Sequence, residues 1–298
     1  MSMDSPHTPS GASAAHHRFT AHAMATTFEI FINHNDADAT YAAQAAQAAF
    51  QEIGRLEEEL SRFRGSSDIY RLGQLAAGES IQVGMAAWDC LSLAKAVYEE
   101  THGAFDVTVG PLMELWVTAD GEPRQVNKET IDKARQIIGS HRFDMDFDTM
   151  NVTVHASGMI FDLGALGKGY AVDQAADLLQ DWKISNFVIN AGDSTLLAIG
   201  APTGKDAWPL TLGNGVQSLP LSNRAVSGSG FAVKGAHIMN PRVFAPVPVG
   251  QRRTYALSPT AALSDALSTA FMVMEKEEIT ALCARYEGVQ ALELQTPV

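Results

Sequence analysis

The sequence predicts an α+β fold, a single large domain in one or two lobes in which helices pack against mixed or antiparallel sheets. Long segments with apolar residues at steps of three or four dominate the first half of the chain, whereas the second half mixes such segments with short strand-like runs. The chain has no internal repeat and no low-complexity linker, which favours one α+β unit over a doubly wound parallel sheet.

The N-terminal half is expected to begin with a strand and to continue as helices. A strand is expected at 24–32, because apolar and polar residues alternate from Phe28 to Ile32. Apolar residues then recur at steps of three or four from Ala46 to Phe63, which predicts a long helix with Phe63 on its buried face. The same periodicity, with cap and stop residues at the ends, predicts helices at 86–100 and 127–139.

The C-terminal half is expected to contain short strands and three helices. A hairpin is expected at 143–155, followed by a strand at 159–163 that leads into a glycine-rich turn at 164–169. The remaining expected elements are a helix at 170–182, strands at 187–190 and 194–199, strand-like pieces up to residue 238, helices at 261–274 and 278–286, and a strand at 289–294.

Composition indicates a globular protein and limits its ligands. The chain has 298 residues, of which 46% are apolar and 18% are charged, and this is enough for a substantial core. Its net charge of −13 repels phosphate backbones, so a nucleic-acid-binding protein is not expected. A phosphate-bearing ligand would need positive charge at its binding site to balance this negative charge, and a divalent cation is the obvious source.

The expected domain organisation is a flexible N-terminal tail at residues 1–17 and one folded domain at 18–298. No apolar run reaches the roughly 18 residues that suggest a transmembrane helix, and the N-terminus lacks the pattern of a signal peptide. A cytoplasmic location is therefore expected. The two cysteines, Cys90 and Cys283, lie in apolar helical patterns and are expected to be core thiols.

The segment 264–269 has the most informative spacing. On a helix, Asp265 and Thr269 are four residues apart and project from the same face. One carboxylate and one hydroxyl there suit Mg²⁺, which takes one or two protein oxygens and completes its octahedron with water and substrate phosphates. The alternative is a Ser/Asp cap that only begins the helix.

A glycine-rich turn at 161–170 is a second candidate. Strand-like residues ending in Asp162 lead into three glycines and Lys168, and a helix follows. Backbone N–H groups and a helix N-terminus favour an anion, although the glycine spacing matches neither the Walker pattern nor the dinucleotide fingerprint. The alternative is a simple tight turn.

Three further polar residues lie beside glycines or prolines. Asp106, in the segment 101–112, is either an exposed site residue or the acceptor of an Asx turn. Asp193 follows a buried strand, a position more typical of a turn than of a site. His237 precedes an Asn-Pro turn and is either structural or, beside a metal–phosphate site, a proton-transfer residue.

The order of the motifs is more specific than any one of them. From the N-terminus the chain carries MATT, SRFRGSSDIYRLG, THGAFDVTVGPLMELW, FDLGALGKGYAVD, NAGD, VSGSG, HIMNPR and SDALSTAFMVM. In this order they resemble the ApbE family of flavin transferases, from about residue 19 to the C-terminus. The sequence departs from the family pattern at several positions, including Ala25, Val107 and Asn240, and none of these is an implied metal ligand.

The resemblance implies transfer of FMN from FAD to a Thr or Ser hydroxyl of a target flavoprotein, with Mg²⁺ (or Mn²⁺) as cofactor, a phosphoester product and release of AMP. His237 matches the transfer histidine of the family. The implied metal ligands are Asp265, Thr269 and the main-chain oxygen of Ala165, with Ser268 alongside. The implied flavin contacts are Met24, Phe63, Ala104, Phe105, Asp106, Asp162, Lys168 and Ile238.

Two other functions stay open from the sequence. One is an FAD pyrophosphatase, in which water replaces the protein hydroxyl as acceptor. The other is a non-catalytic protein that binds and delivers FAD. The joint presence of His237, Asp265 and Thr269 argues against the non-catalytic protein but does not separate transfer from hydrolysis.

Overall fold

A seven-stranded antiparallel sheet forms the centre of the computed structural model, which describes residues 16–33, 35–118, 123–192, 194–212, 217–230, 238–248 and 252–295. Every neighbouring pair of strands in this sheet is antiparallel. The strand order is β1 (His16–Ala23), β2 (Thr26–Asn33), β6 (Phe187–Ala191), β7 (Thr195–Ile199), β10 (Arg224–Ser229), β13 (Arg252–Ser258) and β14 (Gln290–Gln295).

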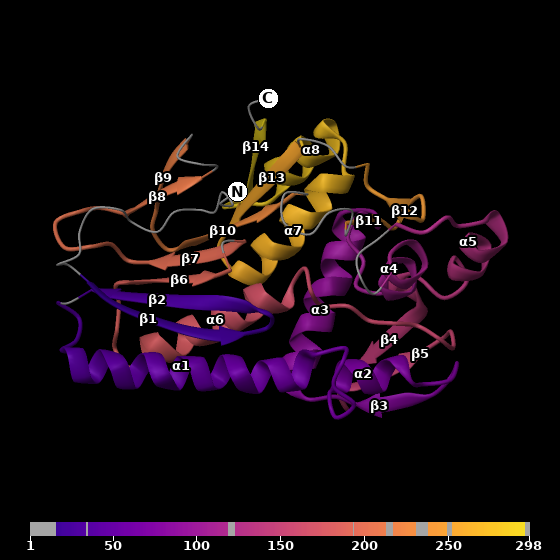
Figure 1. The fold of residues 1–298 in the computed structure, drawn as a ribbon, viewed down its shortest axis with the longest axis horizontal. Coiled ribbons are helices and arrows are strands. Elements are labelled where there is room, and N and C mark those ends of the chain that lie inside the picture. Colours follow the sequence, from indigo (N-terminus) through magenta and orange to yellow (C-terminus); the bar gives the residue numbers. More distant parts are fainter. Residues whose placement is uncertain are drawn as a thin grey trace.

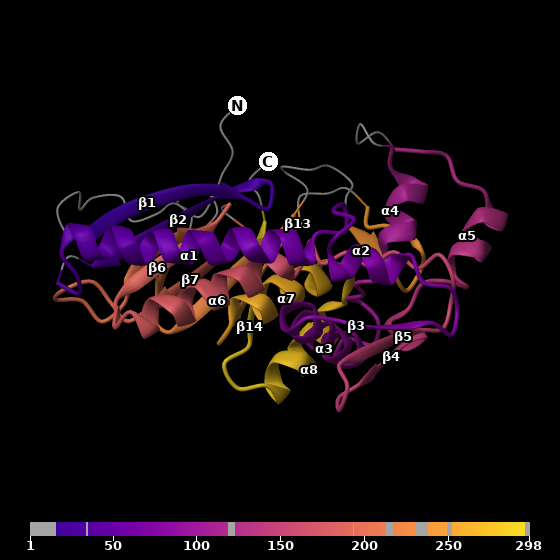
Figure 2. The same ribbon diagram turned by 90° about the horizontal axis from the view of Figure 1, so that it is seen from below.

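The sheet separates two apolar layers, because successive strand residues point to opposite faces. On one face, Ile30 and Ile32 join the main core beneath α1 (Ala39–Leu60), α6 (Gly167–Asp181) and α7 (Ala261–Val273). Figure 2 shows these three helices next to one another along the sheet. On the other face, Phe31 packs with the hairpin of β8 (Trp208–Leu212) and β9 (Gln217–Leu221).

Apart from α8, which lies beside β14, the remaining elements extend the molecule at one end of its long axis, where α4 and α5 lie (Figure 1). They include a three-stranded sheet in the order β3, β5, β4. The main core contains residues from both ends, such as Phe28 and Phe143, so the described chain forms one domain. These elements are α2 (Asp68–Gly73), β3 (Ser80–Gln82), α3 (Met85–Glu100), α4 (Gly110–Trp116), α5 (Lys128–Ala134), η1 (Ser140–Arg142), β4 (Phe143–Asp146), β5 (Asn151–Val154), β11 (Met239–Asn240), β12 (Ala245–Pro246) and α8 (Lys276–Arg285).

Helix α7 is almost wholly buried, in contact with α6, α3 and strands β7, β10 and β13. Its apolar composition all round suits this central position. Gly169 lets α6 approach closely, since a Cβ there would lie 2.3 Å from the carbonyl oxygen of Ala261. Asp173 of α6 then accepts hydrogen bonds from the N–H groups of Ala261 and Ala262, at 2.7 and 2.8 Å. The beginning of α7 is therefore fixed to α6.

Most of the expected elements are confirmed. The antiparallel sheets and packed helices agree with the predicted fold class. The 143–155 hairpin is β4–β5, and the helices expected at 86–100, 170–182, 261–274 and 278–286 are α3, α6, α7 and α8. Asn127 caps α5 as expected, but the helix ends at Ala134 rather than at Gly139.

Two expectations about local structure are wrong, and a third is right except for its first two residues. The strand expected at 24–32 is confirmed as β2, which begins at Thr26, because Met24 lies with Ala25 in the positive-φ turn that joins β2 to β1, a turn without the usual Asn or Gly. Helix α1 ends at Leu60, because Ser61 is already extended, and this leaves Phe63 outside the helix and 78% exposed. The segment 159–163 is largely buried, but instead of a strand it forms one isolated bridge among the described residues, between Val109 and Ile160.

The remaining expectations concern the tail, the thiols and membrane segments. Strand β1 begins at His16, inside the segment expected to be a tail, and residues 1–15 lie outside the described part of the chain. Cys90 is fully buried, Cys283 is partly buried, and both are free thiols. Among the described residues, every helix is too short or too polar to span a bilayer.

Candidate functional site

The site forms where α7, α6 and the end of β10 meet. Asp265 and Thr269 lie one turn apart on α7, as their spacing predicts. Lys168, in the first turn of α6, points to Asp265, and its Nζ lies 3.3 Å from Oδ2 of that carboxylate. Ser229, the last residue of β10, contacts Thr269. The structure thus brings together residues that are about 100 positions apart in the sequence.

Asp265 is a buried carboxylate with few partners. The residue is 4% exposed. Its described contacts are Lys168 Nζ and the N–H of Gly169, both 3.3 Å from Oδ2, which is long for a hydrogen bond. Because a buried carboxylate is costly unless it is paired, this one favours an additional cation.

Hydroxyl groups surround the next turn of α7. Ser229 Oγ lies 2.9 Å from Ser268 Oγ and 3.1 Å from Thr269 Oγ1. Ser268 is fully buried and donates to the carbonyl of Asp265 at 2.9 Å. Thr254 of β13 donates to the carbonyl of Ser268 at 2.8 Å. Ser268 therefore lies alongside Asp265 and Thr269, as expected, with its hydroxyl inside this network.

The turn before α6 is held by side chains of the motifs. Lys168 Nζ donates to the carbonyl of Gly164 at 2.9 Å. Asp162 accepts from the N–H of Gly164 at 2.7 Å and pairs with Arg62 Nε at 2.9 Å. These contacts fix both ends of the turn that contains Ala165, whose carbonyl is the implied main-chain metal ligand. Arg62, which the sequence analysis did not single out, thereby connects the 61–73 motif to this turn.

Donor chemistry at this position fits a magnesium ion. Asp265 and Thr269, one turn apart on α7, carry hard oxygen donors, the type that Mg²⁺ prefers, and the resemblance implies the carbonyl of Ala165 as a third. The ammonium group of Lys168 near Asp265 shows that the carboxylate attracts positive charge. Among the described residues, no three Asp, Glu, His or Cys side chains gather closely enough to hold a metal. A cation here therefore needs hydroxyl, carbonyl or phosphate oxygens as further ligands.

Asp106 is buried, in contrast to the exposed position that its surroundings in the sequence suggested. Its Oδ1 accepts from the N–H and hydroxyl of Thr108, at 2.9 and 2.7 Å, and from Ser140 Oγ at 2.9 Å. Its Oδ2 accepts from the Ser140 N–H at 3.2 Å. Burial raises the pKa of Asp106, although these hydrogen bonds oppose the shift. The alternative of an Asx turn is confirmed.

The other implied flavin contacts differ in accessibility. Phe63 is 78% exposed, and the guanidinium of Arg62 lies 4.4 Å from its ring centroid, so one aromatic face is open to a planar ligand. Ala104, Phe105 and Ile238 are buried. Met24, in the turn between β1 and β2, is partly buried against the core. A role in flavin binding stays a prediction for all of them.

His237 and Asp193 lie outside the described residues. The motif after His237 is described, and Arg242 connects it to the 101–112 loop through hydrogen bonds to the carbonyls of Thr101 and His102, at 2.6 and 3.1 Å. Arg242 also pairs with Glu278 of α8 at 2.9 Å. The HIMNPR and THGAF motifs are therefore neighbours in the fold.

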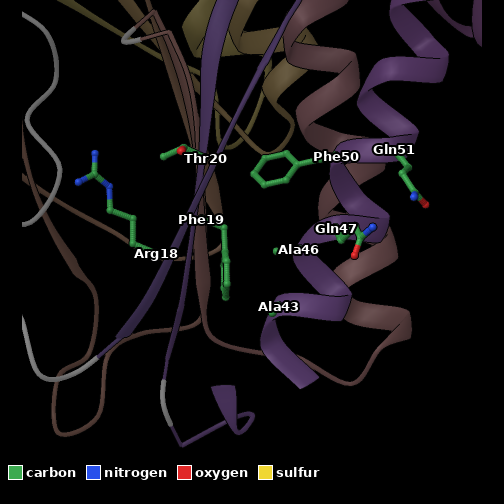
Figure 3. A pocket seen from close by; sticks show the side chains of 8 residues that line it. All are labelled: Arg18, Phe19, Thr20, Ala43, Ala46, Gln47, Phe50 and Gln51. Atoms are coloured by element: carbon green, nitrogen blue, oxygen red, sulfur yellow. The ribbon is translucent and has the colours of Figure 1, made fainter. Parts of the chain in front are cut away.

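A hollow of about 540 Å³ lies away from these motifs, between β1 and α1. Figure 3 shows the side chains of Phe19 of β1 and Phe50 of α1 in the space between these two elements, with Arg18 and Gln51 on opposite sides of it. None of its lining residues belongs to the candidate site. We therefore place the candidate chemistry at the α6–α7 junction, where the buried Asp265 carboxylate has two long contacts.

The sequence assigned no role to two residues that the fold brings to α7. Ser229 belongs to the VSGSG motif, but the hydroxyls of that motif have no diagnostic spacing. Asp173 lies within an amphipathic helical pattern, where an acidic residue suggests only a solvated face. Both contact α7 through tertiary structure, so only the fold could identify them.

Comparisons with known proteins agree with the motif order. The chain is 27% identical over 247 residues to the FAD:protein FMN transferase of Vibrio cholerae, covering 76% of this chain and 73% of that relative. It is 25% identical over 284 residues to the protein of the same name from Escherichia coli K12, covering 85% of this chain and 77% of that relative.

Solved structures show the same fold. The apo flavinyl transferase ApbE of Pseudomonas stutzeri superposes with a TM-score of 0.83 at 23% identity, covering 95% of this chain and 92% of the other. The ApbE protein of Thermotoga maritima gives a TM-score of 0.80 at 26% identity, covering 93% and 94%. The sequence profile of the ApbE family matches residues 24–293, so this chain belongs to the ApbE family.

Proposed function

We propose that this protein is an FAD:protein FMN transferase that uses Mg²⁺ and modifies a Thr or Ser hydroxyl of a target flavoprotein. The family match over residues 24–293 supports the reaction class. The observation that carries the chemistry is the buried Asp265 carboxylate, with one turn of α7 separating it from Thr269 and with Lys168 beside it.

The residues of the site suit a reaction in which positioning and charge neutralisation dominate. Asp265, Thr269 and the Ala165 carbonyl would hold the cation, and Lys168 would face the phosphates of FAD. Bound Mg²⁺ would neutralise the pyrophosphate and stabilise the departing AMP. The Arg62–Asp162 pair fixes the turn that presents Ala165.

His237 is the proposed proton acceptor, on the basis of its motif alone. In the transfer, the acceptor hydroxyl oxygen forms a bond to the phosphorus of the FMN moiety, and the bond from that phosphorus to AMP breaks. The hydroxyl proton goes to the histidine, a role worth about 10²–10⁴-fold in rate. The cytoplasmic location expected from the sequence also stays a prediction.

The test is an incubation with FAD and Mg²⁺, with and without a flavoprotein subunit that a related transferase modifies. We expect AMP release and in-gel flavin fluorescence of the subunit, both dependent on the acceptor. Asp265→Asn should lower AMP release at least about 100-fold, because metal stabilisation of developing charge is worth several kcal/mol.

Other outcomes would reassign the protein. AMP release that does not need an acceptor would indicate the pyrophosphatase, and FAD binding with no AMP in either sample would indicate the non-catalytic binding protein. Near-normal fluorescence of the subunit with Asp265→Asn would contradict the metal assignment.

A further inference from the structure

A chain of three hydroxyl groups connects the end of β10 to the candidate cation site. Thr269 Oγ1 lies 3.1 Å from Ser229 Oγ, which lies 2.9 Å from Ser268 Oγ. Ser268 Oγ in turn lies 2.9 Å from the carbonyl oxygen of Asp265. Within the described part of the chain, Ser229 is the hydrogen-bond partner of the Thr269 hydroxyl.

The end of this chain determines the direction of its hydrogen bonds. A carbonyl oxygen only accepts, so Ser268 donates its single proton to Asp265. Ser268 Oγ must then accept from Ser229, because its own proton is already used. The proton of Ser229 Oγ is used in this donation to Ser268, so Ser229 Oγ accepts a hydrogen bond from Thr269 Oγ1. The Thr269 proton is therefore directed to Ser229, and the lone pairs of its oxygen are left for another partner.

The backbone around the chain is fixed by separate contacts. Thr254 donates to the Ser268 carbonyl at 2.8 Å, and Ser264 donates to the Ala256 carbonyl at 2.6 Å, so two hydroxyls fasten α7 to β13. Gly228 packs against the Tyr255 ring, where a Cβ would approach to 2.6 Å. Since strand and helix are held independently of Ser229, removing its hydroxyl changes the proton arrangement more than the fold.

We propose that Ser229 is a positioning residue of the divalent-cation site and that it acts through Thr269, by holding the Thr269 proton away from the cation. This inference rests on the proposed function, in which Thr269 is a metal ligand. Groups that orient metal ligands in this way typically affect metal affinity by about 10–100-fold when they are removed. The residue itself does not touch the cation.

The test measures binding of Mn²⁺ alone, by the loss of the free-ion paramagnetic resonance signal, without FAD and without turnover. We expect Ser229→Ala to weaken Mn²⁺ binding about 10-fold. Ser229→Thr, which keeps a hydroxyl, should restore the affinity to within about twofold of the wild type, as expected when the hydroxyl is what matters.

Ser227→Ala is the matched control. Ser227 lies on the same strand and is buried, and its hydroxyl contacts Thr195 Oγ1 at 3.3 Å instead of α7. Its removal should leave Mn²⁺ affinity unchanged, whatever it does to stability. An equal loss of affinity in this variant would show that any loosening of β10 weakens the site, and it would overturn the specific role of Ser229.

A double-mutant cycle tests whether Ser229 acts through Thr269. In a Thr269→Val background there is no hydroxyl to orient, so Ser229→Ala should have no further effect on Mn²⁺ affinity. The inference would be overturned if Ser229→Ala lowered Mn²⁺ affinity as much in the Thr269→Val background as in the wild type. It would also be overturned if the single variant Ser229→Ala bound Mn²⁺ with unchanged affinity. If Asp265→Asn binds Mn²⁺ like the wild type, the cation site itself is wrong and the role of Ser229 falls with it.

Discussion

Two buried aspartates in this protein differ in how completely the fold satisfies them. Asp106 is 6% exposed and accepts four hydrogen bonds from Thr108 and Ser140. Asp265 is 4% exposed and has two long contacts, with Lys168 and Gly169. The two side chains are therefore buried to a similar degree. The Asp106 carboxylate accepts hydrogen bonds from residues of its own loop and of η1, whereas the Asp265 carboxylate can still accept contacts from a ligand.

The comparison shows that burial alone does not identify a functional carboxylate. Asp106 ties the 101–112 loop to η1, and Thr108 extends the tie by accepting from the Gly139 N–H at 2.7 Å. Asp265 accepts one long contact from the backbone, at the N–H of Gly169, and it lies one turn of α7 from the hydroxyl of Thr269. We infer a mainly structural role for the Asp106 side chain and a ligand-binding role for Asp265.

The largest effect on stability is expected for Asp106→Ala. The substitution leaves buried N–H and hydroxyl donors without an acceptor, at about 1–3 kcal/mol for each unsatisfied group, so we expect a loss of at least about 3 kcal/mol. Urea unfolding measures it. Asp146→Ala, at the exposed end of β4, is the control. A loss below about 1 kcal/mol for Asp106→Ala would mean that this network is not what holds the loop.

A smaller effect is expected from Asp173, which joins α6 to α7. Burial raises the pKa of Asp173 from an ordinary value of 3.8 to about 6, with the nearby charges of Asp177 and Asp265 adding to the shift. Between pH 3.8 and about 6 the folded chain binds more protons at Asp173 than the unfolded chain does. The contribution of Asp173 to the free energy of unfolding therefore falls as the pH rises.

The measurement compares urea unfolding of the wild type with Asp173→Asn from pH 4 to pH 7. The wild type should lose stability relative to the variant as pH rises towards 6, by on the order of 2 kcal/mol. Asp181→Asn, at the exposed end of the same helix, should show no such trend. A difference between wild type and Asp173→Asn that does not change with pH would contradict the raised pKa.

The smallest effect is expected for Lys168→Met. The ammonium group competes with a cation for Asp265 Oδ2. A unit charge and a divalent cation about 4 Å apart repel by about 2 kcal/mol in water, and screening in physiological salt reduces this to about 1 kcal/mol. Mn²⁺ alone should therefore bind about fivefold more tightly to the variant, the fold-change that corresponds to about 1 kcal/mol. Lys133→Met, which removes an exposed charge on α5, controls for net charge. Unchanged or weaker Mn²⁺ binding would show that Lys168 does not compete.

The sequence predicted those features of the site that depend on local geometry. Asp265 and Thr269 share a face because helical periodicity alone places residues four apart together. Phe63 was misplaced because its apolar spacing continues that of α1, whereas the chain leaves the helix at Ser61 and Arg62 pairs with Asp162. Tertiary contacts of this kind have no periodic signature.

Long-range partners could not be predicted for the same reason. The contact of Ser229 with Thr269 depends on how β10 meets α7, and the clamp by Asp173 depends on the close approach at Gly169. Strand β1 was missed because its turn at Met24 and Ala25 has positive φ without glycine or asparagine. The family resemblance supplied the identity of the site, and the fold supplied the partners of its residues.

The most direct test of the contrast is Mn²⁺ binding to Asp265→Asn and Asp106→Asn, measured alongside urea unfolding of both. We expect Asp265→Asn to lose Mn²⁺ binding but to stay close to the wild type in stability. We expect Asp106→Asn to lose stability but to bind Mn²⁺ normally while it is folded. Normal Mn²⁺ binding by Asp265→Asn, or loss of binding by folded Asp106→Asn, would contradict the assignment of the cation to α7.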